Sequence, residues 1–212
     1  ELKTKFIRNI SSQMEPTLNT LGTSAKELSA QAPRCAEQMQ AQVAALKQFS
    51  DNIQELSSLE NSLTEPYEMG EVNAGTFCES VMEKAKEFMK PDVTPSVNAP
   101  KLQVKTNKEQ LERILLYLLK NAAFYTEQGR ISLDFKKRGA HTHQFIITDT
   151  GTGIPAEQQE NLFKPFTEVK DLTTGDGLGL PICSLIAAKM NGSLTLDTNY
   201  TKGTRFVLEL HV

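Results

Sequence analysis

"DTGTGIP" (149–155) opens the most informative part of this sequence. FKPF follows at 163–166 and GDGLGL at 175–180. An acidic residue ends an apolar run, and glycines follow it two and four positions later. A second group of glycines leads into an apolar helical pattern at 180–190. Amides at the start of a helix bind anions, and a buried carboxylate needs a donor as its partner. The combination predicts a pocket for a purine nucleotide, with ATP as the expected ligand.

Asp149 follows the apolar run 145–148, at a point where the last side chain of a strand can face a pocket. We expect its carboxylate to accept the exocyclic amine of adenine, which would select adenine over guanine. Gly151 and Gly153 permit backbone angles and a close approach that larger residues would prevent. Taken alone, this pattern also fits a plain turn.

The second glycine group consists of Gly175, Gly177 and Gly179, and it precedes a helix whose free amides and dipole favour an anion. No Gly-Lys-Ser/Thr sequence follows, so the group is not a P-loop. No βαβ unit surrounds it, which disfavours a dinucleotide fingerprint. The alternative interpretation is a flexible lid that only caps the helix.

Asn121 interrupts the strongly apolar stretch LLYLLKNAAF at 115–124. Its amide oxygen suits a magnesium ion that is also held by phosphates, because magnesium prefers oxygen ligands. The alternative is a polar residue near the end of a helix.

Patterns outside these motifs predict an α+β fold. Apolar spacing predicts helices over 77–88, 111–122 and 180–190. Alternation predicts strands over 102–106, 131–135, 145–149, 194–196 and 205–210, the last four forming two hairpins across 137–143 and 199–203. Residues 91–100 contain three prolines and are interpreted as a connection. The expected result over 66–212 is a two-layer α/β sandwich with helices on one face of a mixed sheet.

Residues 1–65 predict an antiparallel helical hairpin that serves as a dimerisation domain. The apolar residues of its first helix are Phe6, Ile10, Met14, Leu18 and Leu21, and those of its second are Met39, Leu46 and Ile53 with Phe49, Leu56 and Leu63. The second set forms two series spaced by seven residues, which is an a/d seam. A two-fold dimer with a four-helix bundle would bury both stripes. The alternative is that the stripes dock on the rest of the chain.

The bulk composition narrows the functional classes. A net charge of −3 over 212 residues gives no electrostatic case for nucleic acid, and no basic run argues for contact with a membrane. The three cysteines are far apart and outside any zinc pattern, which indicates inert thiols in a reducing compartment. All three histidines, at 141, 143 and 211, are expected on the surface. The start is not a signal peptide and lacks an initiator Met, so we expect a piece of a longer protein.

Five motifs, in this order, resemble those of the sensor histidine kinase family. LLYLLKNAAFYT at 115–126 is similar to its N box, DTGTGIP to its first glycine box and FKPF to its F box. GDGLGL is similar to the second glycine box, and GTRF at 203–206 to the third. The resemblance covers about residues 66–212. It implies the Bergerat-type ATP-binding domain that is shared with gyrase, the MutL proteins and a class of heat-shock chaperones.

The resemblance also implies a ligand set for ATP and Mg²⁺. Asn121 would coordinate magnesium, Tyr125 would pack near the base, and Thr204 would lie behind it. The implied ATP-binding residues are Asn121, Tyr125, Asp149, Gly151, Gly153, Gly175, Gly177, Leu178, Gly179, Leu180 and Thr204.

The resemblance extends into the hairpin, where the sequence departs from the family pattern. FIRNISSQMEPTL at 6–18 is similar to the phosphoacceptor segment FxxNISHExRTPL, but Ser12 replaces the acceptor His and Gln13 the acidic general base. Residues 1–64 contain no His. In the N box, Tyr117 stands at the first Asn position and Phe124 at the usual Lys. A Ser hydroxyl beside a neutral Gln is a poor phosphoryl acceptor, so the sequence favours ATP binding over autophosphorylation of the hairpin.

Four functions follow as hypotheses. The chain is a histidine kinase homologue that binds ATP without its own acceptor, an active kinase with an unrecognised acceptor, a dimeric scaffold with a vestigial pocket, or an ATPase of the MutL or chaperone type. The upstream hairpin disfavours the last. The resemblance implies a homodimer, a response regulator receiver domain as partner, and a cytoplasmic position within a larger membrane-anchored receptor.

Overall fold

The computed structural model describes residues 2–30, 32–167, 172 and 175–212, and for residues 2–6, 9, 13 and 30 it describes the backbone alone. The chain divides into two compact units. One comprises residues 1–62 and 163–182, and the other comprises residues 63–162 and 183–212. The F box and the second glycine box therefore group with the helical hairpin, whereas the other three motifs belong to the second unit.

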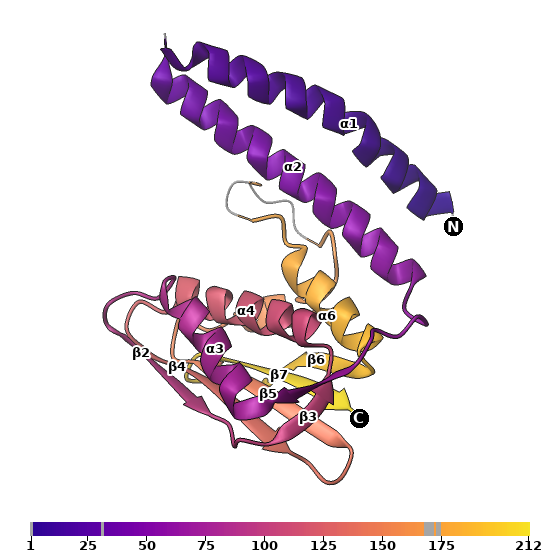
Figure 1. The fold of residues 1–212 in the computed structure, drawn as a ribbon. Helices are drawn as coiled ribbons and strands as arrows, with labels where there is room; N and C mark the ends of the chain where they lie inside the picture. The colour runs from indigo at the N-terminus through magenta and orange to yellow at the C-terminus, as the bar shows by residue number, and fades with distance from the viewer. Residues whose placement is uncertain (1, 31, 168–171, 173–174) are drawn as a thin grey trace. The chain divides into compact units, whose positions relative to one another are not determined.

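The hairpin of the first unit consists of α1 (Leu2–Glu27) and α2 (Pro33–Asn61), joined through the 3-10 turn η1 (Leu28–Ala30). The two helices lie side by side along their length (Figure 1). Ala25 and Ala36 are completely buried between them, and the Ser50 hydroxyl donates to the Ser11 carbonyl at 3.4 Å. Small side chains at these positions let the two backbones approach closely. The predicted hairpin is thereby confirmed.

The apolar stripes of the hairpin are only partly covered within this chain. Leu18 and Leu56 are buried, but Ile10 and Leu21 are each 42% exposed. Leu63 lies beyond the end of α2 and is also exposed. The four-helix bundle of a dimer stays a prediction, and the partly exposed stripe is the surface it would use.

The second unit is built on a five-stranded mixed sheet with the order β2-β4-β5-β7-β6. Its strands are β2 (Val93–Asn98), β4 (Gly129–Lys137), β5 (Thr142–Asp149), β6 (Gly192–Leu196) and β7 (Thr204–His211). β2 runs parallel to β4, and all other pairs are antiparallel. A short two-stranded sheet pairs β1 (Gly70–Asn73) with β3 (Gln103–Thr106). The predicted α+β class with a mixed sheet is confirmed.

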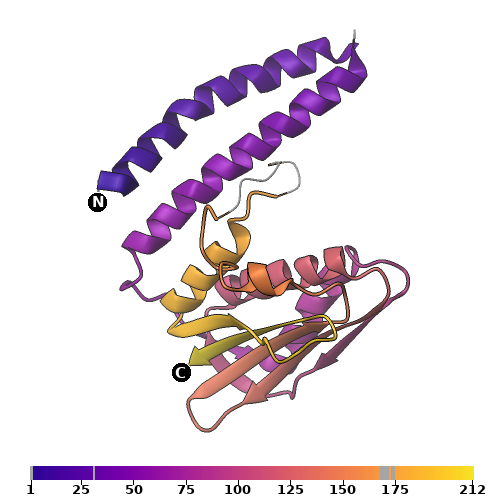
Figure 2. The same ribbon diagram turned by 180° about the vertical axis from the view of Figure 1, so that it is seen from behind.

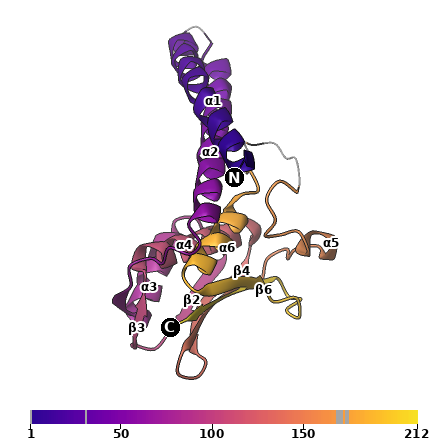
Figure 3. The ribbon, with the colours of Figure 1, turned by 90° about the vertical axis from the view of Figure 1, so that its right-hand side faces the viewer.

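Helices cover one face of this sheet. They are α3 (Ala74–Lys86), α4 (Lys108–Tyr125) and α6 (Gly179–Lys189), of which α6 belongs to the second unit from Cys183 onward. Figure 1 shows them as a layer over the strands, Figure 2 shows the same layer from behind, and Figure 3 shows the short helix α5 (Ala156–Gln159) away from it. The architecture is the two-layer sandwich that the apolar patterns predict.

The core lies between α4 and the sheet. Asn107 caps the start of α4 by accepting the Gln110 amide at 2.9 Å. The apolar face of α4 is then fully buried against alternate residues of the central strands. Its members include Leu111, Ile114, Leu115 and Leu119 from the helix, and Ile131, Leu133, Phe145, Ile147 and Leu208 from the strands. This packing fixes the C-terminal end of α4 beside the end of β5.

Three details of the predictions for this unit were wrong. Residues 91–100 contain strand β2, which accommodates Pro95 because β2 lies at the edge of the sheet, where a missing N–H costs no ladder hydrogen bond. Helix α3 starts at Ala74 and ends at Lys86, so Phe88 lies outside it. His143 is buried on the inner face of β5, its ring 5.4 Å from that of Phe135, and this burial lowers its pKa.

Candidate functional site

Asp149 is the last residue of β5 and is buried, with 4% of its surface exposed. In the register of the sheet it lies opposite Ile131 on one side and Thr204 on the other. Its Oδ1 atom accepts two backbone hydrogen bonds, from Gly151 at 2.9 Å and from Thr204 at 3.2 Å. Among the described residues, the hydrogen bonds to this carboxylate both end on Oδ1, so Oδ2 remains for a ligand.

Burial dominates the electrostatics of Asp149. Loss of water raises the pKa of its carboxyl above the ordinary value of 3.8, and the two amide hydrogen bonds partly oppose that rise. A buried carboxylate with one oxygen uncommitted gains free energy from a neutral donor such as an exocyclic amine. This geometry is compatible with the role predicted for Asp149, which stays a prediction.

The C-terminus of α4 is joined to the first glycine box. The carbonyl of Tyr125 accepts the amide of Thr152 at 3.2 Å. A Cβ on Gly151 would overlap that same carbonyl, so only glycine permits this approach. The Tyr125 side chain is half exposed and contacts Phe124 edge to face, with ring centroids 4.9 Å apart. Asn121 is half-buried one turn earlier on α4.

The third glycine box closes the same site from β7. Gly203 has a φ of 152° and lies against the carbonyl of Asp149, and Gly153, with a φ of 73°, approaches the Gly203 carbonyl. Thr204 is buried directly behind the carboxylate. The second unit thus brings together Tyr125, Asp149, Gly151, Gly153 and Thr204 from three separate stretches of sequence, with Asn121 on the helix that supplies Tyr125.

The second glycine box belongs to the first compact unit. Gly175 and Gly177 have positive φ angles of 137° and 69°, and Leu178 is completely buried. Leu178 donates its amide to the Asp176 Oδ1 atom at 3.0 Å, just before α6 begins at Gly179. The Oδ2 atom of Asp176 accepts the Asn52 side-chain amide of α2 at 2.5 Å. Leu180, the second residue of α6, is buried.

Sequence reasoning missed Asp176 and Tyr200. Asp176 interrupts a glycine run that was expected to face phosphates, and an acidic residue in such a run is a signal that could have been noticed. Tyr200 donates its hydroxyl to the Asp149 carbonyl at 3.2 Å across 51 residues. An aromatic residue within a short turn between two strands was the available signal.

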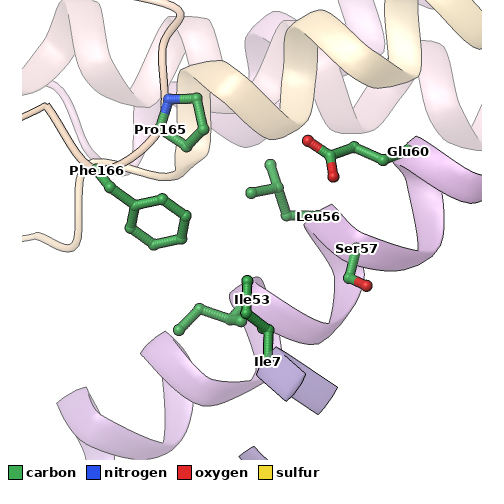
Figure 4. Close-up of a pocket in the computed structure, with 7 residues that line it drawn as sticks. All are labelled: Ile7, Ile53, Leu56, Ser57, Glu60, Pro165 and Phe166. Atoms are coloured by element: carbon green, nitrogen blue, oxygen red, sulfur yellow. The ribbon is translucent and has the colours of Figure 1, made fainter. Parts of the chain in front are cut away.

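A small cavity lies within the first unit, between the hairpin and the F box (Figure 4). Ile7, Ile53, Leu56, Pro165 and Phe166 supply its apolar lining, and Ser57 and Glu60 complete it. Phe166 has a φ of 62° and is half exposed. The lining carries no feature that binds a nucleotide.

The positions that replace the phosphoacceptor pair lie on α1. Ser12 is exposed on this helix, and the side chain of Gln13 lies outside the described part of the chain.

Within the described residues, no group of three or more His, Cys, Asp or Glu side chains could hold a metal ion. The role of Asn121 as a magnesium ligand stays a prediction.

Comparison with known proteins identifies the domain. The family model for histidine kinase-, DNA gyrase B-, and HSP90-like ATPases matches residues 106–212, which is just over half of the chain. The chain belongs to this ATPase family. The matched range includes Asn121, Asp149 and all three glycine boxes.

Curated relatives place the chain on the histidine kinase side of this ATPase family. It is 25% identical to the aerobic respiration control sensor protein ArcB of Escherichia coli (strain K12) over 99% of the chain and 28% of ArcB. It is 33% identical to the sensor histidine kinase RcsC of Salmonella typhimurium (strain LT2) over 58% of the chain and 13% of RcsC. The chain thus spans less than a third of the length of these relatives.

Solved structures share the fold. The full-length ShkA crystal structure in complex with AMPPNP is 21% identical, with a TM-score of 0.74 over 97% of this chain and 45% of that one. The Acinetobacter baumannii histidine kinase AdeS is 20% identical, with a TM-score of 0.69 over 92% of this chain and 95% of AdeS. Among the described helices of the present ATPase-family chain, none is both long enough and apolar enough to cross a membrane.

Proposed function

We propose that this chain is the ATP-binding core of a two-component sensor histidine kinase homologue that acts in phosphorelay signalling without phosphorylating its own hairpin. The buried carboxylate of Asp149 carries this proposal. Its Oδ1 atom is held by the amides of Gly151 and Thr204, and its Oδ2 atom is left for the exocyclic amine of adenine. Membership of the ATPase family supports ATP as the ligand.

The residues fit ATP and its magnesium ion unequally. Asp149 binds the base, and the half-exposed side chain of Tyr125 lies beside the same loop. Asn121 is the one magnesium ligand that we assign to the chain itself, with the remaining positions filled by phosphate oxygens and water. When bound, the ion neutralises phosphate charge and orients the phosphates.

The hairpin lacks the chemistry of a phosphoacceptor. A serine hydroxyl becomes a good nucleophile only when a neighbouring base removes its proton, and Gln13 is neutral. In the N box, an exposed Phe124 stands where the family places a lysine, which removes a cation from the phosphate side. These differences support nucleotide-dependent signalling, or phosphorylation of a His on a partner chain, over self-phosphorylation at Ser12.

The wider assignment follows from the relatives. We propose that the chain forms a homodimer through the partly exposed stripes of its hairpin. A response regulator receiver domain is the expected partner, as for the two-component sensors that it resembles. The proposed location is cytoplasmic, within a larger membrane-anchored receptor.

Binding of a fluorescent ATP analogue with magnesium tests the pocket directly, and saturable binding is expected.

The second candidate function is a dimeric scaffold with a vestigial pocket. It is favoured by Phe124, which is 69% exposed where a phosphate-binding cation is expected. Absence of binding at millimolar nucleotide would leave the scaffold as the better description.

Incubation with labelled ATP should leave the hairpin without phosphohistidine. The histidines of this chain are at 141, 143 and 211, so none lies in α1 or α2. We expect no label of any kind within residues 1–64 of the wild type, neither acid-labile nor base-labile. A double variant, Ser12→His with Gln13→Glu, is the matched control, because it restores the acceptor and its base. An acid-stable, base-labile label at Ser12 of the wild type, as phosphoserine gives, would overturn the proposal.

ATP affinity should fall as the solution is acidified. Only the ionised carboxyl of Asp149 offers two acceptor oxygens, and burial raises its pKa above 3.8. Affinity is therefore expected to be full at neutral pH and to be lost as the pH falls through this raised pKa. Dissociation constants measured over a pH series check this. The same series with Asp149→Asn corrects for titration of the phosphates, and an identical pH profile in both proteins would exclude Asp149 as the titrating group.

A further inference from the structure

The turn between β6 and β7 packs directly on the backbone of Asp149. Tyr200, in the middle of this turn, is half-buried and donates its hydroxyl to the Asp149 carbonyl at 3.2 Å. The guanidinium of Arg205 lies over the Tyr200 ring, 4.2 Å from its centroid. The Arg205 Nε atom also donates to the Thr148 hydroxyl at 3.0 Å. Tyr200 and Arg205 thus contact the last two residues of β5 from the side of the turn.

Asp197 gives the turn its shape. Its Oδ1 atom accepts the amide of Asn199 at 3.1 Å, and its carbonyl accepts the amide of Tyr200 at 3.3 Å. Its Oδ2 atom lies 3.5 Å from the Arg205 guanidinium. Arg205 is therefore held by an acceptor on each side, Asp197 and Thr148, and supports the Tyr200 ring between them.

These contacts bear on the carboxylate through Thr204. This residue follows the turn and donates its amide to the Asp149 Oδ1 atom. A turn fixed against the Asp149 carbonyl fixes the position of that amide, and with it the orientation of the carboxylate. Precise placement of a buried acceptor matters because a misaligned hydrogen bond is weak.

We propose that Tyr200 and Arg205 are positioning residues that orient Asp149 toward adenine and thereby set the selectivity of the site for adenine nucleotides. This inference rests on the proposed ATP-binding function. It assigns neither residue a contact with the nucleotide. Loss of the Tyr200 hydroxyl removes one hydrogen bond, which corresponds to about a fivefold loss of adenine-specific affinity.

The test uses Tyr200→Phe, which keeps the ring beneath Arg205 and removes only the hydroxyl. Thr201→Ala, at an exposed neighbour in the same turn, is the matched control. The first readout is amide hydrogen exchange of Gly151 and Thr204 without nucleotide. The second is the ratio of affinities for ATP and inosine triphosphate, whose base carries an oxygen in place of the amine. Tyr200→Phe should accelerate exchange at both amides and narrow the ratio about fivefold, whereas Thr201→Ala should change neither.

Failure of the proposed ATP-binding function and failure of the proposed positioning role give different results. If the wild type does not bind ATP, the proposed function fails, and hydrogen exchange alone decides whether Tyr200 positions the Asp149 loop. If the wild type binds ATP but Tyr200→Phe changes neither exchange nor the ratio, the positioning role is refuted. Equal loss of affinity for ATP and inosine triphosphate would also refute it, since that pattern indicates general loosening. Arg205→Lys, which keeps a cation but loses the planar guanidinium, should give the same signature and serves if Tyr200→Phe folds poorly.

Discussion

Asp149→Asn is expected to weaken ATP binding by roughly 10- to 100-fold, the range for a hydrogen bond to a charged group, without unfolding the protein. The substitution is well suited to this site. Asn keeps an oxygen at Oδ1, so the amides of Gly151 and Thr204 retain their acceptor. It places an NH₂ group where the second oxygen stood, and that group faces the adenine amine donor to donor.

Asp149→Asn should lower the affinity for ATP but should not lower the stability of the folded protein. Burial raises the pKa of the Asp149 carboxyl above its value in the unfolded chain. A group shifted in this direction favours folding fully below its unfolded pKa, and this contribution is lost as the pH rises through the folded pKa. The ionised carboxylate is therefore unfavourable for folding at neutral pH. Asn is uncharged, so the unfolding temperature at neutral pH should be maintained or raised.

Calorimetric titration with ATP and thermal denaturation measure the two effects in the same preparations. Asp134→Asn is the matched control, because Asp134 lies half-buried on β4, on the opposite face of the sheet from the core. It should leave ATP affinity unchanged. An Asp149→Asn protein that binds ATP as well as the wild type would refute the placement of adenine, and a large fall in unfolding temperature would refute the electrostatic argument.

Gly203→Ala should produce a large loss of stability, more than about 3 kcal/mol. Gly203 has a φ of 152°, which side chains rarely adopt. A Cβ here would overlap the carbonyl of Asp149, the same atom that accepts the Tyr200 hydroxyl. The turn would have to move away from β5, and the Thr204 amide would move with it. Loss of nucleotide binding should accompany the loss of stability.

Gly139→Ala separates backbone strain from steric overlap. Gly139 also has a positive φ, 75°, but a Cβ there meets no atom within 4 Å. Its substitution should therefore cost only the left-handed backbone penalty, about 1 kcal/mol. Urea denaturation of the two variants gives the comparison. Equal free energies of unfolding would contradict the claim that overlap with Asp149 decides the cost at Gly203.

The sequence predicted features whose causes are local. Asp149 and its glycines lie within five residues of each other, so their pattern is visible without a fold, and alternation marked the two hairpins of the sheet. Contacts between distant residues left no comparable pattern. The hydrogen bond from Tyr200 to Asp149 joins residues 51 apart, and that from Asn52 to Asp176 joins residues 124 apart.

Two further features, the close contact of α1 with α2 and strand β2, were not predicted, because the residue types involved do not by themselves indicate a buried helix contact or a strand. The close contact of α1 with α2 relies on buried Ser11 and Ser50 and on alanines, whereas the seven-residue pattern drew attention to larger side chains that are only half covered. Pro95 concealed strand β2, since a proline argues against a strand unless its place in the sheet is known.

Pro95 also has a consequence for aggregation of this protein through the edge of its sheet. An exposed outer strand offers a row of unsatisfied donors and acceptors to any other extended chain, which is a common route to aggregation. β2 is such an outer strand, and Pro95 removes a donor near its middle. Extension of the sheet by a neighbouring molecule is thereby interrupted at this edge.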